Sequence, residues 1–320
     1  MSEQRALKSD YRRLPLETLH AIAEHGAEVL QQPVQVQAVA AFVAGGFITL
    51  GAALSVFLSM GQASAGIANL LLGLGFVSGF FLVVTTGAAL FTEVNVMIPV
   101  FLLSMRKTRR ACPSEQADNA APVSSVCIKT CLRFWVVVWT FNLLGALFVG
   151  GMMKAGNVLT YDAEERLDEI MAGKIDKFKD NGAQGWFQVV ASAFLGNWLV
   201  GMAALLATSA RTLSGKAIGI FFPVLAFVSL GVQHSPANMG YFCIGLIALD
   251  ESPITWGEAF GWNLVPASIG NLFGGGIMVA LVFYYMFLHH DEAICDAIYA
   301  KGKAKDKDHV VWPSKDAEQA

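Results

Sequence analysis

The chain has 320 residues, of which 55% are hydrophobic and only 15% are charged, and its formal net charge is −3. A soluble domain would have about 25% charged residues, and a nucleic-acid-binding protein would have clustered basic residues. The composition therefore excludes a nucleic-acid partner and predicts a lipid bilayer as the surroundings of the chain.

The first 35 residues are rich in charged side chains and have no early apolar stretch, which excludes a signal peptide. Within them, the segment from Leu14 to Leu30 has the pattern of an amphipathic helix that lies on a membrane surface. We therefore expect residues 1–35 to form a cytoplasmic N-terminal segment with an interfacial helix.

Six apolar stretches follow, and each is long enough to cross a bilayer. They run over residues 36–60, 66–104, 130–153, 187–209, 215–249 and 259–288. The sequence therefore predicts an all-α, multi-pass membrane domain over residues 36–288, followed by a polar tail over residues 289–320.

Lysine and arginine gather in the loops on one side of the predicted membrane. The connection over residues 106–126, which is unusually long, begins with Arg106, Lys107, Arg109 and Arg110, whereas the opposite loops are acidic. Basic loops stay in the cytoplasm, and six is an even number of spans. We therefore expect both termini in the cytoplasm and the protein in a cell membrane, the inner membrane of a bacterium.

The second and fifth stretches are too long for one span each, and both contain a break. Gly87 precedes Thr92 in one stretch, and Gly231 precedes His234 and Pro236 in the other. Glycine and proline at membrane depth free backbone groups, which must then line protein or water rather than lipid. Two discontinuous helices indicate a transport site near the middle of the bilayer.

The two halves of the membrane domain are similar in sequence. Residues 45–54 in the first span match residues 196–205 in the fourth, and residues 142–145 in the third match residues 271–274 in the sixth. Three spans followed by three similar spans insert with opposite orientation. The predicted fold is therefore an inverted 3+3 repeat of six transmembrane helices, the second and fifth of them broken.

His234 is the only histidine inside the apolar stretches. An ionisable residue there is a candidate functional residue because its charged form is costly in the membrane, and histidine can exchange a proton near neutral pH. The alternative is a neutral histidine whose hydrogen bonds are satisfied within the helix break. Thr92, at the other break, is its expected symmetric counterpart, with a hydroxyl that can donate to an anion or bond the histidine ring.

Four asparagines are candidates for supporting these breaks. Asn142, Asn197 and Asn271 lie among small residues inside the spans, and Asn238 follows His234 by one helical turn. Amide side chains in such places either hydrogen-bond to loop backbone or line a pore. We expect Asn142, Asn197 and Asn238 to support the loops and Asn271 to lie near the histidine.

Nothing in the sequence predicts catalysis, a metal or a cofactor. Of the five scattered cysteines, Cys127 and Cys131 lie one helical turn apart, but no histidine lies near them. Apolar filling is the better interpretation. We therefore expect a protein that is not an enzyme, with no cofactor and no metal site.

Three segments resemble the motifs of the formate/nitrite transporter family. Residues 231–239 resemble the family's central signature, residues 87–92 its loop in the second helix, and residues 263–276 its last span. The likeness covers about residues 14–288. Members of the family are homopentamers of aquaporin-like protomers, each with its own pore, and the resemblance implies the same fold and assembly here.

The resemblance also implies roles for individual residues. By position, the family's central histidine falls on His234, its loop threonine on Thr92 and its supporting asparagine on Asn271. The family's apolar constrictions, which would otherwise be interpreted as ordinary packing, fall on Phe76, Phe80, Leu90 and Phe227.

The chain departs from the family's pattern close to this site. Gln233 stands where the family usually has glutamate, which removes a charge. Counting back from the asparagine of the fourth span, the family's vestibule lysine falls on Asn181, and Lys179 fills that place only with a two-residue insertion. Lys174 and Lys177 lie further back. The predicted vestibule residues are therefore Lys179 and Asn181.

These features together predict transport of a small monovalent weak-acid anion, formate or nitrite, with a proton. An anion crosses an apolar ring only at great cost, whereas its neutral acid does not carry that cost. Whether His234 itself supplies the proton stays open. The alternatives are the same fold carrying hydrosulfide, lactate, acetate or bicarbonate, and a membrane anchor or scaffold that transports nothing.

Overall fold

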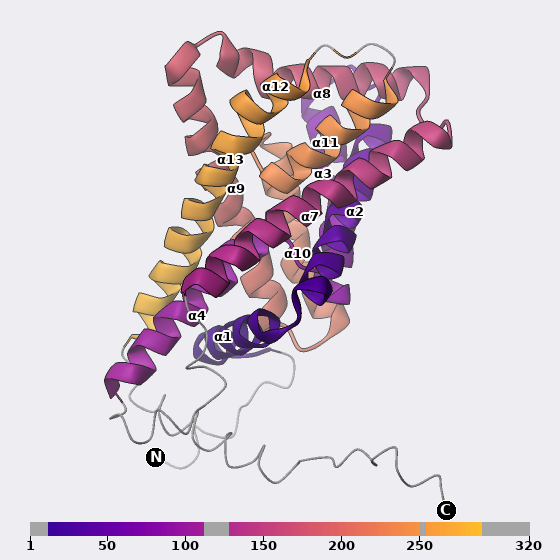
Figure 1. Cartoon of the computed structure of the whole chain (residues 1–320). Helices are drawn as coiled ribbons and strands as arrows, with labels where there is room; N and C mark the ends of the chain where they lie inside the picture. The colour runs from indigo at the N-terminus through magenta and orange to yellow at the C-terminus, as the bar shows by residue number, and fades with distance from the viewer. Residues whose placement is uncertain (1–11, 112–127, 250–251, 253, 290–320) are drawn as a thin grey trace, which may run out of the picture.

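The computed structural model describes residues 12–111, 128–249, 252 and 254–289, and these are almost entirely helical (Figure 1). Among these residues there is no β-strand, and a single isolated bridge joins Arg12 to Ala210. Nearly all of the predicted polar tail over residues 289–320, and most of the long connection over residues 106–126, fall outside the described residues.

The unbroken apolar stretches form long helices at the predicted places. These are α2 (Val34–Ser59), α7 (Ile128–Ala155) and α9 (Gly182–Ser209). The last stretch is one continuous helix with π-helical segments: α12 (Trp256–Glu258), η1 (Ala259–Leu264), α13 (Val265–Phe273), η2 (Gly274–Leu281) and η3 (Tyr284–Leu288). Counting α3 (Ala65–Thr86) as well, five of the described helices are long and apolar enough to cross a membrane.

The second and fifth stretches are broken helices, as the sequence predicts. The second consists of α3 (Ala65–Thr86) and α4 (Phe91–Ala111), and the fifth of α10 (Leu213–Ser229) and α11 (Ser235–Ala248). Gly87, the residue after α3, and Gly231, two residues after the end of α10, take positive φ angles of 73° and 67°. This conformation is open to glycine because it has no Cβ. The predicted all-α fold with two broken helices is confirmed.

Two further helices lie at opposite ends of the molecule (Figure 1). At one end, α1 (Pro15–Gln31) packs on α4 and α9 and buries Leu19, Ile22 and Leu30. At the other end, α8 (Tyr161–Lys179) packs on α9 and α11. We call these the α1 end and the α8 end. The apolar stretches give no sign of α8, which is an amphipathic helix between the third and fourth spans. It carries Lys174.

Glycines allow the long helices to approach closely at two equivalent crossings. Gly145 of α7 lies against the carbonyl oxygen of Phe42 in α2, and Gly274 of η2 lies against the carbonyl oxygen of Phe194 in α9. A Cβ at either glycine would overlap that oxygen. Small residues at membrane helix crossings permit such contact between backbones. The third and sixth spans thus contact the first and fourth in the same way.

We predict that Gly145→Ala destabilises the protein and that Gly151→Ala does not. Both glycines lie in α7, but a Cβ at Gly151 meets no atom within 4 Å. Overpacking at Gly145 should cost about 1–3 kcal/mol, which lowers the thermal midpoint of the purified protein in detergent. Equal midpoints for the two variants would show that the close crossing contributes nothing to stability.

Candidate functional site

The two helix breaks meet at a hydrogen bond between His234 and Thr92. His234 is the residue that precedes α11, and Thr92 lies in the first turn of α4. Their side chains are 1% and 0% exposed, and His234 Nε2 lies 2.8 Å from Thr92 Oγ1. The structure therefore brings together two predicted site residues that are 142 positions apart in the chain.

The other ring nitrogen of His234 fixes its tautomer. His234 Nδ1 accepts a hydrogen bond of 3.2 Å from the backbone N–H of Ala237, so that the ring caps the start of α11. A nitrogen that accepts from an N–H has no proton of its own. The neutral ring therefore carries its proton on Nε2 and donates it to Thr92 Oγ1. The hydroxyl proton of Thr92 is not used in this bond and can be donated elsewhere.

Aromatic rings cover this pair. The ring of Phe227 lies 5.0 Å from the His234 ring between centroids, and the ring of Phe76 lies 5.5 Å from that of Phe227, edge to face. Phe80 and Leu90 are 0% exposed and belong to the same hydrophobic cluster as the two phenylalanines. Phe227 thus lies beside the histidine and Phe76 beside Phe227, while Phe80 and Leu90 are buried in the same cluster.

Asn271 holds both neighbours of His234 in place. Its Oδ1 accepts from the backbone N–H of Ser235 at 2.8 Å, and its Nδ2 donates to the carbonyl oxygen of Gln233 at 3.2 Å. The same Nδ2 donates to the carbonyl oxygen of Ala193 in α9 at 2.8 Å. A buried backbone group without such a partner would cost about 1–3 kcal/mol. Asn271 therefore fixes the loop and also lies near the histidine.

Asn142 makes the same set of hydrogen bonds at the other break. Its Oδ1 accepts from the N–H of Phe91 at 2.9 Å, and its Nδ2 donates to the carbonyl oxygens of Ala89 at 3.0 Å and Ala41 at 2.7 Å. The residue between the two bonded loop positions is Leu90, as His234 is on the other side. The counterpart of His234 is therefore Leu90. The expectation that Thr92 is the symmetric counterpart of His234 is wrong by two residues.

Asn197 connects the two breaks. Its Nδ2 donates to the carbonyl oxygen of Asn271 at 2.6 Å and to that of Thr92 at 3.2 Å. Asn197 is fully buried. Its amide therefore ties the backbone at Thr92 to the last span, which in turn holds the loop at His234.

Gln233 and Asn238 belong to a buried amide network that reaches α8. Asn238 Nδ2 donates to Gln233 Oε1 at 2.8 Å and to Asn263 Oδ1 at 2.6 Å. Asn263 Nδ2 in turn donates to Gln233 Oε1 and to the carbonyl oxygen of Lys174, both at 3.0 Å. The residue before the histidine is thereby joined to the backbone at Lys174.

The structure places the two predicted vestibule residues at the surface of the α8 end. Lys179 forms an ion pair with Glu258, and this hydrogen-bonded carboxylate raises the pKa of Lys179. Asn181 Nδ2 donates to the carbonyl oxygen of Lys177 at 3.0 Å and is exposed. Neither contacts the buried network around His234 among the described residues.

Lys174 is the lysine that the structure brings towards the site. Its Nζ lies 5.4 Å from the ring centroid of Tyr241. Burial, together with the charge of Lys177, lowers the pKa of Lys174 to about 8. The sequence does carry a signal for this position. Lys174 falls on the apolar stripe of α8, among the buried Leu167, Met171 and Phe178 at helical spacing.

Comparisons with known proteins agree with this architecture. Residues 16–285 match the family described as Formate/nitrite transporter. A probable formate transporter of Methanothermobacter thermautotrophicus is 32% identical over 268 residues, which are 78% of this chain and 88% of that protein. The formate channel FocA of Escherichia coli strain K12 is 30% identical, over 79% of this chain and 86% of the channel.

Two solved structures have the same fold. An FNT family ion channel superposes with a TM-score of 0.69 at 20% identity and covers 84% of this chain and 98% of its own. A pentameric formate channel with formate bound superposes with a TM-score of 0.62 at 24% identity, over 80% and 98% of the two chains. At these identities the likeness supports the fold of the protomer.

We predict that Asn271→Leu and Asn142→Leu each lower the thermal midpoint of the detergent-purified protein, whereas Asn181→Leu leaves it unchanged. Each of the first two variants leaves two buried loop backbone groups unpaired, at about 1–3 kcal/mol for each group. Asn181 is exposed and provides the control. A midpoint for Asn271→Leu equal to that of Asn181→Leu would contradict the supporting role.

Proposed function

The chain belongs to the formate/nitrite transporter family, and we propose that it carries a small monovalent weak-acid anion, formate or nitrite, across a cell membrane together with a proton. The observation that carries this proposal is the buried hydrogen bond between His234 and Thr92, with phenylalanine rings over it. The matched relatives named as formate transporters and channels support the choice of passenger.

The apolar rings make the neutral acid the form that passes. Burying an unpaired anion among Phe76 and Phe227 would cost far more than a few contacts return. The acid, in contrast, needs only hydrogen-bond partners at the midpoint. Thr92 donates a hydrogen bond from its hydroxyl group. His234 donates one from Nε2–H once the passenger has displaced the threonine oxygen. His234 Nδ1 stays bonded to Ala237, so the ring acts as a neutral hydrogen-bond donor. The anion takes up its proton from a hydronium ion of the vestibule solution, which leaves as water.

Lys174 is the residue that gathers anions at the α8 end in this proposal. Its ammonium lies over the ring of Tyr241, whose ring in turn lies 6.4 Å from that of Phe76. Gln233 is neutral and accepts from Asn238 and Asn263, so residue 233 does not offset that charge. Lys174 would raise the local concentration of the anion. Protonation of the anion there would then produce the neutral acid next to the rings.

We further propose a homopentamer with the α1 end in the cytoplasm. Large apolar side chains such as Phe148, Phe187 and Phe222 are exposed on the outer faces, where lipid or another protomer covers them. The solved formate channel described as pentameric supports this assembly. Arg211 and Lys216 lie at the α1 end, and such basic residues remain on the cytoplasmic side.

The central test is uptake of formate and nitrite into proteoliposomes, with lactate, acetate, bicarbonate and hydrosulfide in parallel. His234→Phe should reduce formate uptake about tenfold or more, because a hydrogen bond to the passenger is lost at the narrow point. His25→Phe, the same change on α1, serves as the matched control. Parent-like uptake by His234→Phe would refute the central role of His234. An inactive parent, with all six solutes, would favour a scaffold.

The pH dependence of uptake tests Lys174. Its ammonium, with a pKa near 8, is present below pH 8 and is lost as the pH rises through 8. A single charge at short range contributes about 1 kcal/mol, or about fivefold in local anion concentration. Relative to Lys174→Arg, which stays charged, the parent should therefore lose about fivefold in formate uptake between pH 7 and pH 9. A ratio that is constant with pH would refute this role, since formate protonation changes equally for both proteins.

A further inference from the structure

Tyr241 continues the file of aromatic rings from His234 towards Lys174. It is 2% exposed and lies seven residues after His234 on α11, about two helical turns away and hence on the same side. Its ring lies 6.4 Å from that of Phe76, which lies 5.5 Å from that of Phe227. The ring of Tyr241 is thus the last in the file before the lysine.

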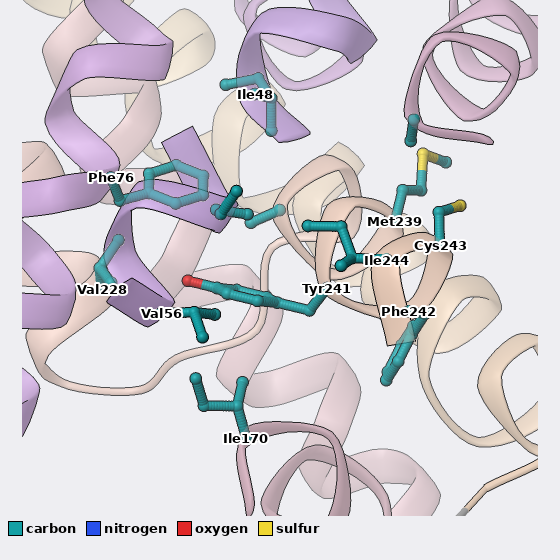
Figure 2. Close-up of a cluster of buried hydrophobic side chains, with 14 of the residues drawn as sticks. Ile48, Val56, Phe76, Ile170, Val228, Met239, Tyr241, Phe242, Cys243 and Ile244 are labelled. Atoms are coloured by element: carbon teal, nitrogen blue, oxygen red, sulfur yellow. The ribbon is translucent and has the colours of Figure 1, made fainter. Parts of the chain in front are cut away.

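The hydroxyl group anchors the Tyr241 ring. Tyr241 Oη lies 2.8 Å from Ser55 Oγ in α2, and Ser55 Oγ itself donates to the carbonyl oxygen of Ala52 at 2.6 Å. Since Ser55 has only one hydroxyl proton, the phenol donates to Ser55. Figure 2 shows the ring extending from α11 past Val56, with its oxygen directed towards Phe76 and Val228. The side chain is therefore fixed at its Cα by α11 and at its hydroxyl group by Ser55.

Lys174 is held at its backbone and at its ammonium by different elements. Its carbonyl oxygen accepts from Asn263, and its Nζ lies 5.4 Å from the centroid of the Tyr241 ring. This distance is within the range of a cation–π contact. The helix that carries it is also tied to α2, because Arg166 Nε donates to Ser59 Oγ at 3.1 Å, one turn from Ser55.

A ring face holds a cation without cancelling its charge. Within the part of the chain that the structure describes, the ion pairs involve Arg166, Lys179 and Arg211, and none involves Lys174. A carboxylate partner would fix the ammonium equally well but would remove the attraction for an anion. The contact with Tyr241 leaves a positive charge at a fixed place beside the aromatic file.

We propose that Tyr241 is a positioning residue for transport: its ring holds the Lys174 ammonium at the entrance of the aromatic file while leaving its charge available to the anion. This inference rests on the proposed function, in which the anion gathers at the α8 end before it crosses as the acid. Tyr241 acts through Lys174 and not by contact with the protonated acid at the midpoint.

The experiment is a double-mutant cycle between residues 241 and 174, read as the concentration dependence of formate uptake into proteoliposomes. Tyr241→Leu, which removes the ring, should raise KM roughly three- to tenfold with a smaller change in maximal rate. Tyr241→Phe, which keeps the ring face, should stay within about twofold of the parent. In a Lys174→Met background, Tyr241→Leu should cause no further rise in KM.

Phe242→Leu is the matched control, because Phe242 is the next residue of α11 and is also fully buried. It removes an equal ring but should leave KM unchanged. A rise in KM for Tyr241→Leu that persists in the Lys174→Met background, or that Phe242→Leu reproduces, would overturn the proposal. So would a parent-like KM for Tyr241→Leu itself.

A second readout separates this inference from the proposed function. The thermal midpoints of the same four proteins of the cycle, measured in detergent, need no transport. Contact between ring and ammonium predicts that the effects of Tyr241→Leu and Lys174→Met on the midpoint are not additive. Additive midpoints would refute the contact even if formate is carried, and a parent that carries no formate would refute the proposed function alone.

Discussion

A break in a helix inside a bilayer frees backbone N–H and C=O groups that lipid cannot hydrogen-bond, so protein or water must do so. Here one buried amide at each break meets that requirement, Asn142 beside Leu90 and Asn271 beside His234. Each amide also bonds a neighbouring span through Ala41 or Ala193. These bonds fix the positions of the two loops. They therefore also fix the positions of Leu90, Thr92 and His234, which the loops carry.

The two asparagines hold their loops in the same way, but the residue held at the centre of each loop is different. The loop that Asn142 holds presents Leu90, and the loop that Asn271 holds presents His234. Thr92 follows Leu90 by two residues and reaches the ring nitrogen that the helix cap leaves free. His234 and Thr92 therefore form a polar pair with the ring of Phe227 beside it and that of Phe76 next in line. In the proposed mechanism this arrangement admits a neutral acid, which needs a few hydrogen bonds, and excludes an ion, which needs many.

The sequence was sufficient for the breaks but not for every site residue. Gly87 and Gly231 mark the breaks locally, because only glycine takes their backbone conformation easily. Lys174 could not be located by counting from the fourth span, because it lies on a separate helix, α8, that packs on α9 and α11. Tyr241 and Asn263 look like ordinary span residues in the sequence. Their partners lie on α2 and α8, which are far away in the chain, and only the folded structure brings them together.

The direct partners of Lys174 explain how a positive charge can serve a pathway that the ion itself does not cross. Asn263 bonds its backbone, Gln233 lies behind that amide, and Tyr241 lies against its ammonium; all three are neutral. A glutamate at residue 233 would place a negative charge in this network. With glutamine there, the charge of Lys174 stays available outside the aromatic file. In the proposed function, attraction of the anion and passage of the acid are then separate tasks, carried out by residues only a few side chains apart. The neutral partners of the lysine are therefore as much a part of the proposed function as the lysine itself.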